Sequence, residues 1–268
     1  MECRRFILVA ALLATATFAG ADETTLCNFY ITSLPYSIFT QGHYCFDRNL
    51  STAMTSGNAI GIYSDFVVLD LNNFKLGGGS AGLGTNTIGI NVDTNRNNIT
   101  IRNGNIRGFR IGIAFGSVGD NDLVETNVLD GNTNVGISVG AGGTSVIRNN
   151  LVINTGGSTQ NPDRVIGIGA SATNSGSTTA VRDNIVSNTF NSSTYYIVKG
   201  TIGIFVEGGL ADHNLVSAGT VAKGTAVGIY GYRVAYCRDN TVLNNTPGLA
   251  YPGCTQIGPP GSNDTNAP

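Results

Sequence analysis

The stretch VIRNNLVINTGG, residues 146–157, places an apolar residue two positions after an asparagine, and close relatives of it recur along the chain. They are VETNVLDGNT (124–133), VRDNIVSNTF (181–190), ADHNLVSAGT (211–220) and CRDNTVLNNT (237–246). If the shared asparagine is position zero, it falls at Asn127, Asn150, Asn184, Asn214 and Asn240. Self-similarity of this kind identifies a repeat architecture.

The order of residue types within the repeat predicts its local structure. Apolar, polar, turn-forming and again apolar residues indicate a short strand, a tight bend and a second short strand. We expect the asparagine at position zero to adopt left-handed backbone at the bend and to bond nearby main chain. Stacked asparagines on successive coils would then form an internal ladder with a structural role.

A second marker, a glycine between aliphatic residues, alternates with the first. It occurs at Gly61, Gly89, Gly112, Gly136, Gly167, Gly203 and Gly228. Gly112 follows Gly89 by 23 residues, and longer gaps contain TGGSTQNPDRV (155–165) and NSSTYYIVKG (191–200), which we expect to be surface loops on one side. A coil of constant circumference with insertions predicts an all-β right-handed parallel β-helix over residues 57–256.

The two ends of the chain differ from this repeat. Arg4 and Arg5 precede an apolar run that ends in small residues at Ala19-Gly20-Ala21, which predicts a signal peptide over residues 1–21. We therefore expect export to an extracellular or periplasmic location, and no other stretch has the length of a membrane span. The polar segment 257–268 is expected to be a disordered tail.

Four cysteines remain after removal of the signal peptide, in two groups at opposite ends of the chain. Four cysteines allow three pairings, and export places them where disulfides persist. We favour the pairs that are near in sequence, Cys27 with Cys45 and Cys237 with Cys254. Metal binding is the poorer alternative, because no CxxC motif or histidine cluster accompanies them.

The formal net charge is −2 and charged residues make up 12% of the chain. Nucleic-acid binding requires clustered basic charge, so this composition argues against it. We expect a monomer without a cofactor.

The opening of the chain resembles a known group of proteins. The segments ITSLPYSIFTQGHYCFDRNLS (31–51), GIYSDFVVLDLNNFKL (61–76) and NNITIRNGNIRGF (97–109) look like the start of secreted bacterial parallel β-helix repeat proteins of the pectate-lyase-like superfamily. The resemblance implies an N-terminal cap, which we place at residues 22–56. Caps are needed because an open coil end exposes strand edges and core.

The resemblance also implies contact with polysaccharide along one outer sheet, with lyase, hydrolase or epimerase chemistry in the enzymes of the group. This chain lacks the Arg-x-Lys and Asp-Pro-His motifs of the polygalacturonases and mannuronan epimerases. Calcium is allowed by the resemblance to pectate lyases, but the sequence has no GGxGxD calcium repeat, so we assign no metal site.

One group of polar residues could carry chemistry. The repeat register stacks Glu125, Arg148, Arg182, Asp212 and Arg238 before the bend, and Thr126, Asn149, Asp183, His213 and Asp239 at the next position. This places His213 about one strand spacing from Asp183 and Asp239. We therefore name Asp183, Asp212, His213 and Asp239 as candidate acid–base residues.

Neighbouring cations and aromatic rings are candidates for binding rather than chemistry. Arg148, Arg182 and Arg238 could hold sugar carboxylates in bidentate fashion, and Tyr232 could stack on a sugar ring. A surface ion ladder is the alternative interpretation, since charges on neighbouring coils relieve each other. The functional prediction is an exported solenoid that contacts polysaccharide, and the alternative is a non-enzymatic surface, adhesion or structural solenoid.

Overall fold

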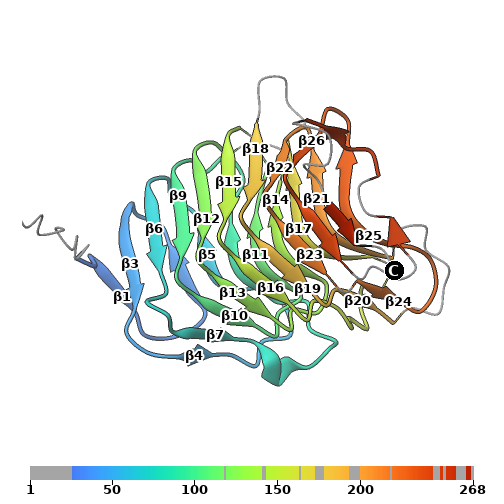
Figure 1. Ribbon diagram of the computed structural model, residues 1–268. Helices are drawn as coiled ribbons and strands as arrows, with labels where there is room; N and C mark the ends of the chain where they lie inside the picture. The colour runs from blue at the N-terminus through green and yellow to red at the C-terminus, as the bar shows by residue number, and fades with distance from the viewer. Residues whose placement is uncertain are drawn as a thin grey trace, which may run out of the picture.

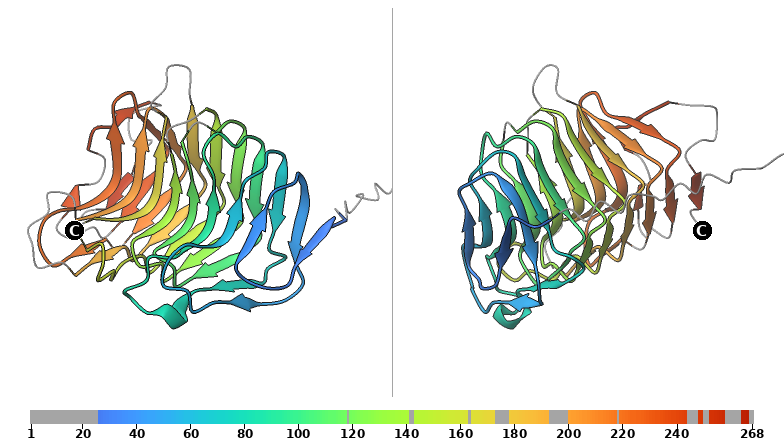
Figure 2. Two further views of the ribbon diagram at one scale, coloured as in Figure 1. Left: turned by 180° about the vertical axis from the view of Figure 1, so that it is seen from behind. Right: turned by 90° about the vertical axis from the view of Figure 1, so that its left-hand side faces the viewer.

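The computed structural model describes residues 26–117, 119–140, 143–162, 164–172, 178–192, 200–217, 219–243, 248–249, 252–257 and 264–266. The predicted signal peptide therefore lies outside the described residues. The chain forms a right-handed parallel β-helix whose coils stack along one axis, from the N-terminal end to the C-terminal end (Figures 1 and 2). Each full coil contributes one strand to each of three parallel sheets.

The three sheets are named A, B and C. Sheet A contains, in spatial order, β1 (Phe29–Ile31), β3 (Gly42–Phe46), β6 (Val67–Asp70), β9 (Ile99–Arg102), β12 (Asp122–Glu125), β15 (Ser145–Arg148), β18 (Thr179–Arg182), β22 (Leu210–Asp212), β26 (Tyr236–Arg238) and β29 (Thr255–Gln256). Sheet C contains β4 (Leu50–Ser51), β7 (Lys75–Gly77), β10 (Asn105–Arg107), β13 (Val128–Asp130), β16 (Leu151–Ile153), β19 (Ile185–Ser187), β23 (Leu215–Ser217), β27 (Thr241–Leu243) and β30 (Asp264–Asn266).

Sheet B follows sheet C in each coil. It contains β2 (Tyr36–Ile38), β5 (Asn58–Ile62), β8 (Ile88–Val92), β11 (Ile111–Phe115), β14 (Val135–Val139), β17 (Val165–Ser171), β21 (Thr201–Glu207), β25 (Ala226–Tyr232) and β28 (Gly248–Leu249). Between sheets C and B lie the short 3-10 helix η1 (Gly79–Ala81) and a two-stranded pair, β20 (Phe190–Asn191) with β24 (Thr220–Val221). None of the helical structure among the described residues is long and apolar enough to cross a bilayer.

The core is built from rows of aliphatic side chains that point inward on consecutive coils. Val124, Ile147 and Val181 are paired in register on sheet A, and each is at most 1% exposed. The apolar residues two positions after the asparagine form the matching row on sheet C. Burying each such side chain contributes about 1.5–3 kcal/mol, which no isolated coil could achieve.

The asparagine ladder is confirmed. The Oδ1 of Asn184 accepts bonds from the backbone N–H and the Nδ2 of Asn150, both at 3.0 Å. Asn184 in turn bonds Asn214 in the same way, and Asn214 bonds Asn240. These side chains are at most 2% exposed. Each amide therefore makes the hydrogen bonds to the buried main chain of the bend that water cannot make.

The predicted left-handed conformation, however, belongs to the residue before the asparagine. Positive φ angles of 52° to 56° occur at Thr126, Asn149, Asp183, His213 and Asp239. The expectation for position zero was therefore wrong by one residue. The left-handed residue turns its own side chain outward and directs the following asparagine inward, where the ladder forms.

The glycine marker corresponds to a close approach of backbones within sheet B. A Cβ on Gly89 would lie 2.6 Å from the carbonyl oxygen of Gly112, and a Cβ on Gly112 would lie 2.8 Å from that of Gly136. Because real Cβ atoms do not approach so closely, only glycine permits this column.

Strands of the three sheets also occur outside residues 57–256. Strands β1 to β4 fall within the segment expected to be a cap, yet they are the first strands of the three sheets. Strand β30 lies in the segment expected to be a disordered tail, and it pairs in parallel with β27. Both predicted disulfides are confirmed, with Cys27 bonded to Cys45 and Cys237 bonded to Cys254.

Candidate functional site

The outer face of sheet A carries a row of charged side chains, one per coil, which we call the charge row. The strand pairing places these members side by side: Asp70, Arg102, Glu125, Arg148, Arg182, Asp212 and Arg238. The repeat predicted the five from Glu125 to Arg238. They lie at the ends of their strands, where the alternation of the strand turns them outward just before the left-handed bend.

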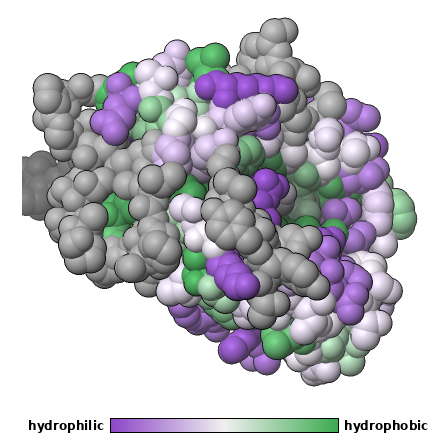
Figure 3. Space-filling model, turned by 90° about the vertical axis from the view of Figure 1, so that its right-hand side faces the viewer, coloured by the Kyte–Doolittle hydropathy of each residue, from purple (hydrophilic) through white to green (hydrophobic). Residues whose placement is uncertain are grey.

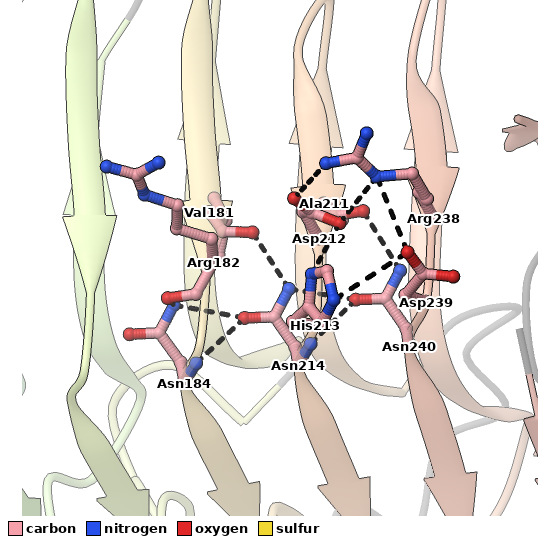
Figure 4. A network of polar contacts seen from close by, with 10 residues as sticks. All are labelled: Val181, Arg182, Asn184, Ala211, Asp212, His213, Asn214, Arg238, Asp239 and Asn240. Atoms are coloured by element: carbon pink, nitrogen blue, oxygen red, sulfur yellow. Dashed lines mark hydrogen bonds and ion pairs between the residues drawn. The ribbon is translucent and has the colours of Figure 1, made fainter. Parts of the chain in front are cut away.

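Most of the charge row is neutralised by its own neighbours. Arg102 bonds Asp70 at 2.7 Å, Arg148 bonds Glu125 at 2.7 Å, and Arg238 bonds Asp212 at 2.6 Å. Arg182 differs, because within the part of the chain that the structure describes it has no ion-pair partner. Figure 4 shows its guanidinium pointing away from the neighbouring acid. The row therefore contains one arginine available to an anionic ligand.

Four ionisable side chains lie together where β22 and β26 end, and we call them the histidine cluster. They are Asp212, His213, Arg238 and Asp239 (Figure 4). His213 Nδ1 lies 2.9 Å from Asp212 Oδ1, and His213 Nε2 lies 3.7 Å from Asp239 Oδ2. The Nε of Arg238 lies 3.0 Å from Asp212 Oδ1 and 3.6 Å from Asp239 Oδ2.

Exposure and charge distinguish the members of the cluster. The Asp212 side chain is 10% exposed, whereas that of His213 is 55% exposed. Hydrogen bonds from Arg238 hold the pKa of Asp212 below its usual value, with His213 adding to the effect and burial opposing it. Asp212 is thus a buried carboxylate that orients an accessible imidazole, an arrangement suited to proton transfer.

The other predicted site residues fall outside this cluster. Asp183 is in the same bend row, and its backbone N–H bonds the Asp212 carbonyl at 3.1 Å, but its side chain is exposed and makes no ion pair with any described residue. Tyr232 ends β25 in sheet B and is 49% exposed. Its ring lies under the guanidinium of Arg233, 5.8 Å from the ring centroid, and not beside His213.

Two further residues of sheet A were not among the predicted site residues. Tyr236 is 39% exposed and precedes Arg238 by two residues on β26, so both side chains lie on the same face. Because side chains two positions apart on a strand lie on the same face, the position of Arg238 in the sequence would have selected Tyr236 over Tyr232. Asp122 begins β12 and is 4% exposed, and burial raises its pKa to about 7. Its burial depends on the preceding turn, which the repeat pattern does not describe.

A shallow depression of about 270 Å³ lies on sheet A beside two arginines of the charge row. Asp122, Leu123, Thr144, Val146, Arg148 and Arg182 are among the residues that line it. One wall is therefore formed by the two adjacent arginines, and the floor is formed by outward aliphatic side chains. Such a surface can hold a ligand that carries both carboxylates and apolar C–H groups.

The histidine cluster is a poor match to a calcium site. Asp212, His213 and Asp239 place one ligand atom each within 4.8 Å of one another. Calcium takes six to eight oxygen ligands, but here the guanidinium of Arg238 already engages both oxygens of Asp212. The second such group, Cys27, His43 and Cys45, contains the two sulfurs of a disulfide.

Comparison with known proteins identifies a shared fold. No protein-family model matches the chain, and no curated protein matches it. The chain is similar to the enzymatically active domain of tailspike protein 2 of bacteriophage CBA120, with 14% identity and a TM-score of 0.50 over 86% of this chain and 37% of that one. It also matches the Dettilon tailspike protein, with 13% identity and a TM-score of 0.34 over 87% of this chain and 62% of that one.

The chain thus spans less than two thirds of either tailspike. At this level of identity the likeness concerns architecture alone. It agrees with the three parallel sheets described above, and the fold is the right-handed parallel β-helix.

Proposed function

We propose that the protein is exported and binds an acidic polysaccharide along the outer face of sheet A. The observation that carries this proposal is the guanidinium of Arg182, which has no ion-pair partner among the described residues and lies next to Arg148 in the depression. A uronate polymer presents one carboxylate on each sugar, and planar guanidinium groups recognise carboxylates in bidentate fashion. The aliphatic floor of the depression would contact the C–H faces of the sugar rings.

Two further observations support the proposal. Both disulfides are typical of proteins that fold in an oxidising compartment, as expected for export. The tailspike domain of similar fold is described as enzymatically active, although that description belongs to the phage protein. We extend it to this chain only as a hypothesis about the histidine cluster.

If the ligand is also cleaved, His213 is the residue that would move the proton. Its Nδ1 faces Asp212, and a hydrogen bond there holds the proton on Nδ1. Nε2 then carries the free lone pair, and its 3.7 Å separation from Asp239 leaves it open to a substrate hydroxyl or C–H group. Asp212 would orient the ring, and Arg182 would hold the sugar carboxylate.

The test is equilibrium binding to polygalacturonate, alginate and hyaluronan, with dextran as a neutral reference, in the presence and absence of calcium. Arg182→Ala should weaken binding to the acidic polymers about tenfold, the loss expected for one charge-assisted contact, and leave dextran unaffected. Arg164→Ala, which removes the same charge from an exposed position before β17, is the matched control. His213→Ala should remove any release of reducing or unsaturated sugar ends while binding persists.

The alternative, a structural or adhesive solenoid without a sugar site, is favoured by one observation. Three acid–arginine pairs neutralise six of the seven members of the charge row, as a stabilising ion ladder would. If the folded protein binds none of the acidic polymers, the alternative holds. If it binds them and Arg182→Ala binds as tightly as the wild type and Arg164→Ala, Arg182 is not part of the binding site.

A further inference from the structure

A second depression lies at the corner where sheet C passes into sheet B, away from the charge row of sheet A. Its volume is about 250 Å³, below the usual range for drug-sized ligands. Leu83, Arg107, Asp130 and Thr133 line it, together with glycines from three successive coils. All of these residues belong to the described part of the chain. The depression on sheet A is lined by other residues.

The glycines explain why the depression is open. A Cβ on Gly79, Gly82 or Gly131 would meet no protein atom within 4 Å, so any larger residue there would project into free space. Gly108 has the opposite role, because its missing Cβ allows the two coils to touch. A Cβ there would lie 2.5 Å from the backbone nitrogen of Gly79. The wall of the depression is therefore formed by the backbone of these glycines, without side chains to cover it.

The polar groups of the depression form an opposed pair. Arg107 Nη2 lies 3.4 Å from Asp130 Oδ2, longer than a well-formed hydrogen bond, and the side chains are 54% and 23% exposed. Asp130 is held from the other side, because its Oδ1 accepts a 2.8 Å bond from Asn154 Nδ2. The carboxylate is thus positioned by one oxygen and available through the other.

Two more groups complete the lining. Leu83 is 55% exposed and presents an apolar edge. Thr133 is only 2% exposed, and its Oγ1 is covered by protein and has no hydrogen-bond partner among the described residues. The polar groups that a ligand in the depression can reach are therefore those of Arg107 and Asp130.

We propose that this corner depression binds a single neutral sugar ring. The Asp130 carboxylate would repel an anionic ligand, and the Arg107 guanidinium would repel a cationic one. The pair therefore disfavours a charged ligand of either sign. Hydroxyl groups satisfy both, because one donates to the carboxylate while its neighbour accepts from the guanidinium. Leu83 would cover an apolar C–H face of the ring, and the small volume limits the ligand to one ring.

The experiment is an NMR titration of the isotope-labelled chain, without its signal peptide, with the methyl glycosides of glucose, galactose and mannose. We expect at least one of the three to shift the backbone amides of residues 79–83, 107–108 and 130–133. Leu83→Ala and Asp130→Asn should each weaken that binding at least about tenfold, a factor that corresponds to about 1.4 kcal/mol. The asparagine oxygen can still accept from Asn154, and unchanged melting would confirm that the fold is intact.

Two control variants separate this site from sheet A. Leu26→Ala removes the same side chain from a position that is 85% exposed at the N-terminal end, and it should leave the neutral-sugar titration unchanged. Arg182→Ala should also leave it unchanged, whether or not the protein binds acidic polymers. The proposal is overturned if none of the three glycosides shifts these amides, or if Leu83→Ala and Asp130→Asn bind like the wild type.

Discussion

The side-chain amide of Asn184 makes hydrogen bonds to three backbone groups at the bend. Its Nδ2 donates to the carbonyl oxygens of Ile147 and Arg182, both at 2.9 Å, and its Oδ1 accepts two bonds from Asn150. The residue is fully buried. Each bend of the solenoid thus depends on one side chain for the main-chain bonds that water cannot provide.

Asn184→Ala should therefore destabilise the protein by about 1–3 kcal/mol, because it leaves buried donors and acceptors without partners. Urea denaturation of the protein measures the change. Asn91→Ala is the control, since Asn91 is half-buried on β8 and outside the ladder, and its effect should stay within about 0.5 kcal/mol. Equal changes for the two variants would contradict the ladder as a source of stability.

The bend row contains one residue type that is poorly suited to its backbone. Thr126 has a φ of 56°, and β-branched residues rarely adopt this conformation, whereas asparagine does so readily. Asn149 occupies the equivalent position on the next coil with a φ of 54°. The side chain of Thr126 is exposed, so a replacement would disturb little packing.

We expect Thr126→Asn to stabilise the protein by about 1 kcal/mol through relief of this strain. Thr100→Asn, in the middle of extended β9, serves as the comparison and should be neutral or destabilising, because asparagine is disfavoured in strands. Melting temperatures of the two variants rank them, and a Thr126→Asn variant less stable than the wild type would argue against strain at this bend.

Among the strands, β12 begins with a carboxyl group whose burial disfavours its ionised form. Asp122 is 4% exposed, and burial together with the nearby Asp120 and Asp65 raises its pKa to about 7. Its Oδ1 accepts a bond from the Ile99 backbone N–H at 3.0 Å, which opposes the shift but does not cancel it. The folded state therefore favours the protonated form of this side chain.

The pH dependence follows from the sign of that shift. Below the ordinary carboxyl pKa, both the folded and the unfolded protein hold the proton. As the pH rises toward about 7, the unfolded chain ionises first, so the free energy of unfolding falls by up to about 1.4 kcal/mol per pH unit from this group. Above the folded pKa the loss is complete and the dependence levels off.

Asp122→Asn should remove this dependence while its Oδ1 still accepts from Ile99. At pH 8 we expect the variant to be more stable than the wild type by about 2–4 kcal/mol, and at pH 4 the two should differ little. Chemical denaturation across this pH range is the measurement. A constant difference at all pH values would show that the pKa of Asp122 is the same in the folded and unfolded states.

On the scale of the whole molecule, most backbone hydrogen bonds between coils join direct neighbours, so stability is distributed along the axis. The loop between β16 and β17 reaches farther, because the Thr159 N–H donates to the Leu83 carbonyl oxygen at 3.2 Å. The two disulfides close the ends, with sequence separations of 18 and 17 residues. At the C-terminal end, hydrophobic and hydrophilic residues are mixed across the described surface (Figure 3), so some apolar surface there remains uncovered. A covalent link is the natural reinforcement for such an end.

Replacing Cys237 and Cys254 together by serine should cost about 3 kcal/mol in the chain-entropy model of a loop of this size. The effect should be local, with faster hydrogen exchange in β22, β26 and β27 and unchanged exchange in β3 and β6. The corresponding Cys27/Cys45 variant should show the reverse distribution. Uniform acceleration along the chain in both variants would mean that the solenoid unfolds as one cooperative unit.

The sequence by itself determined the fold, the strand register, the asparagine ladder and both disulfides. The fold, the register and the ladder repeat from coil to coil, and in a parallel stack equivalent residues must lie over one another, so the spacing of Asn150 and Asn184 in the chain already specifies their contact. The charge row was predictable for the same reason. The disulfides do not repeat, and their pairing was inferred from the nearness of each pair of cysteines in the sequence.

Only the tertiary structure decided which groups remain available for function. Long side chains can turn toward either neighbouring coil, so the partner of Asp212 proved to be Arg238, which left Arg182 unpaired. The burial of Asp122 and the two depressions depend on how turns of different length pack together at the corners. Those turns are the parts of each coil that do not repeat, and a periodic pattern carries no information about them.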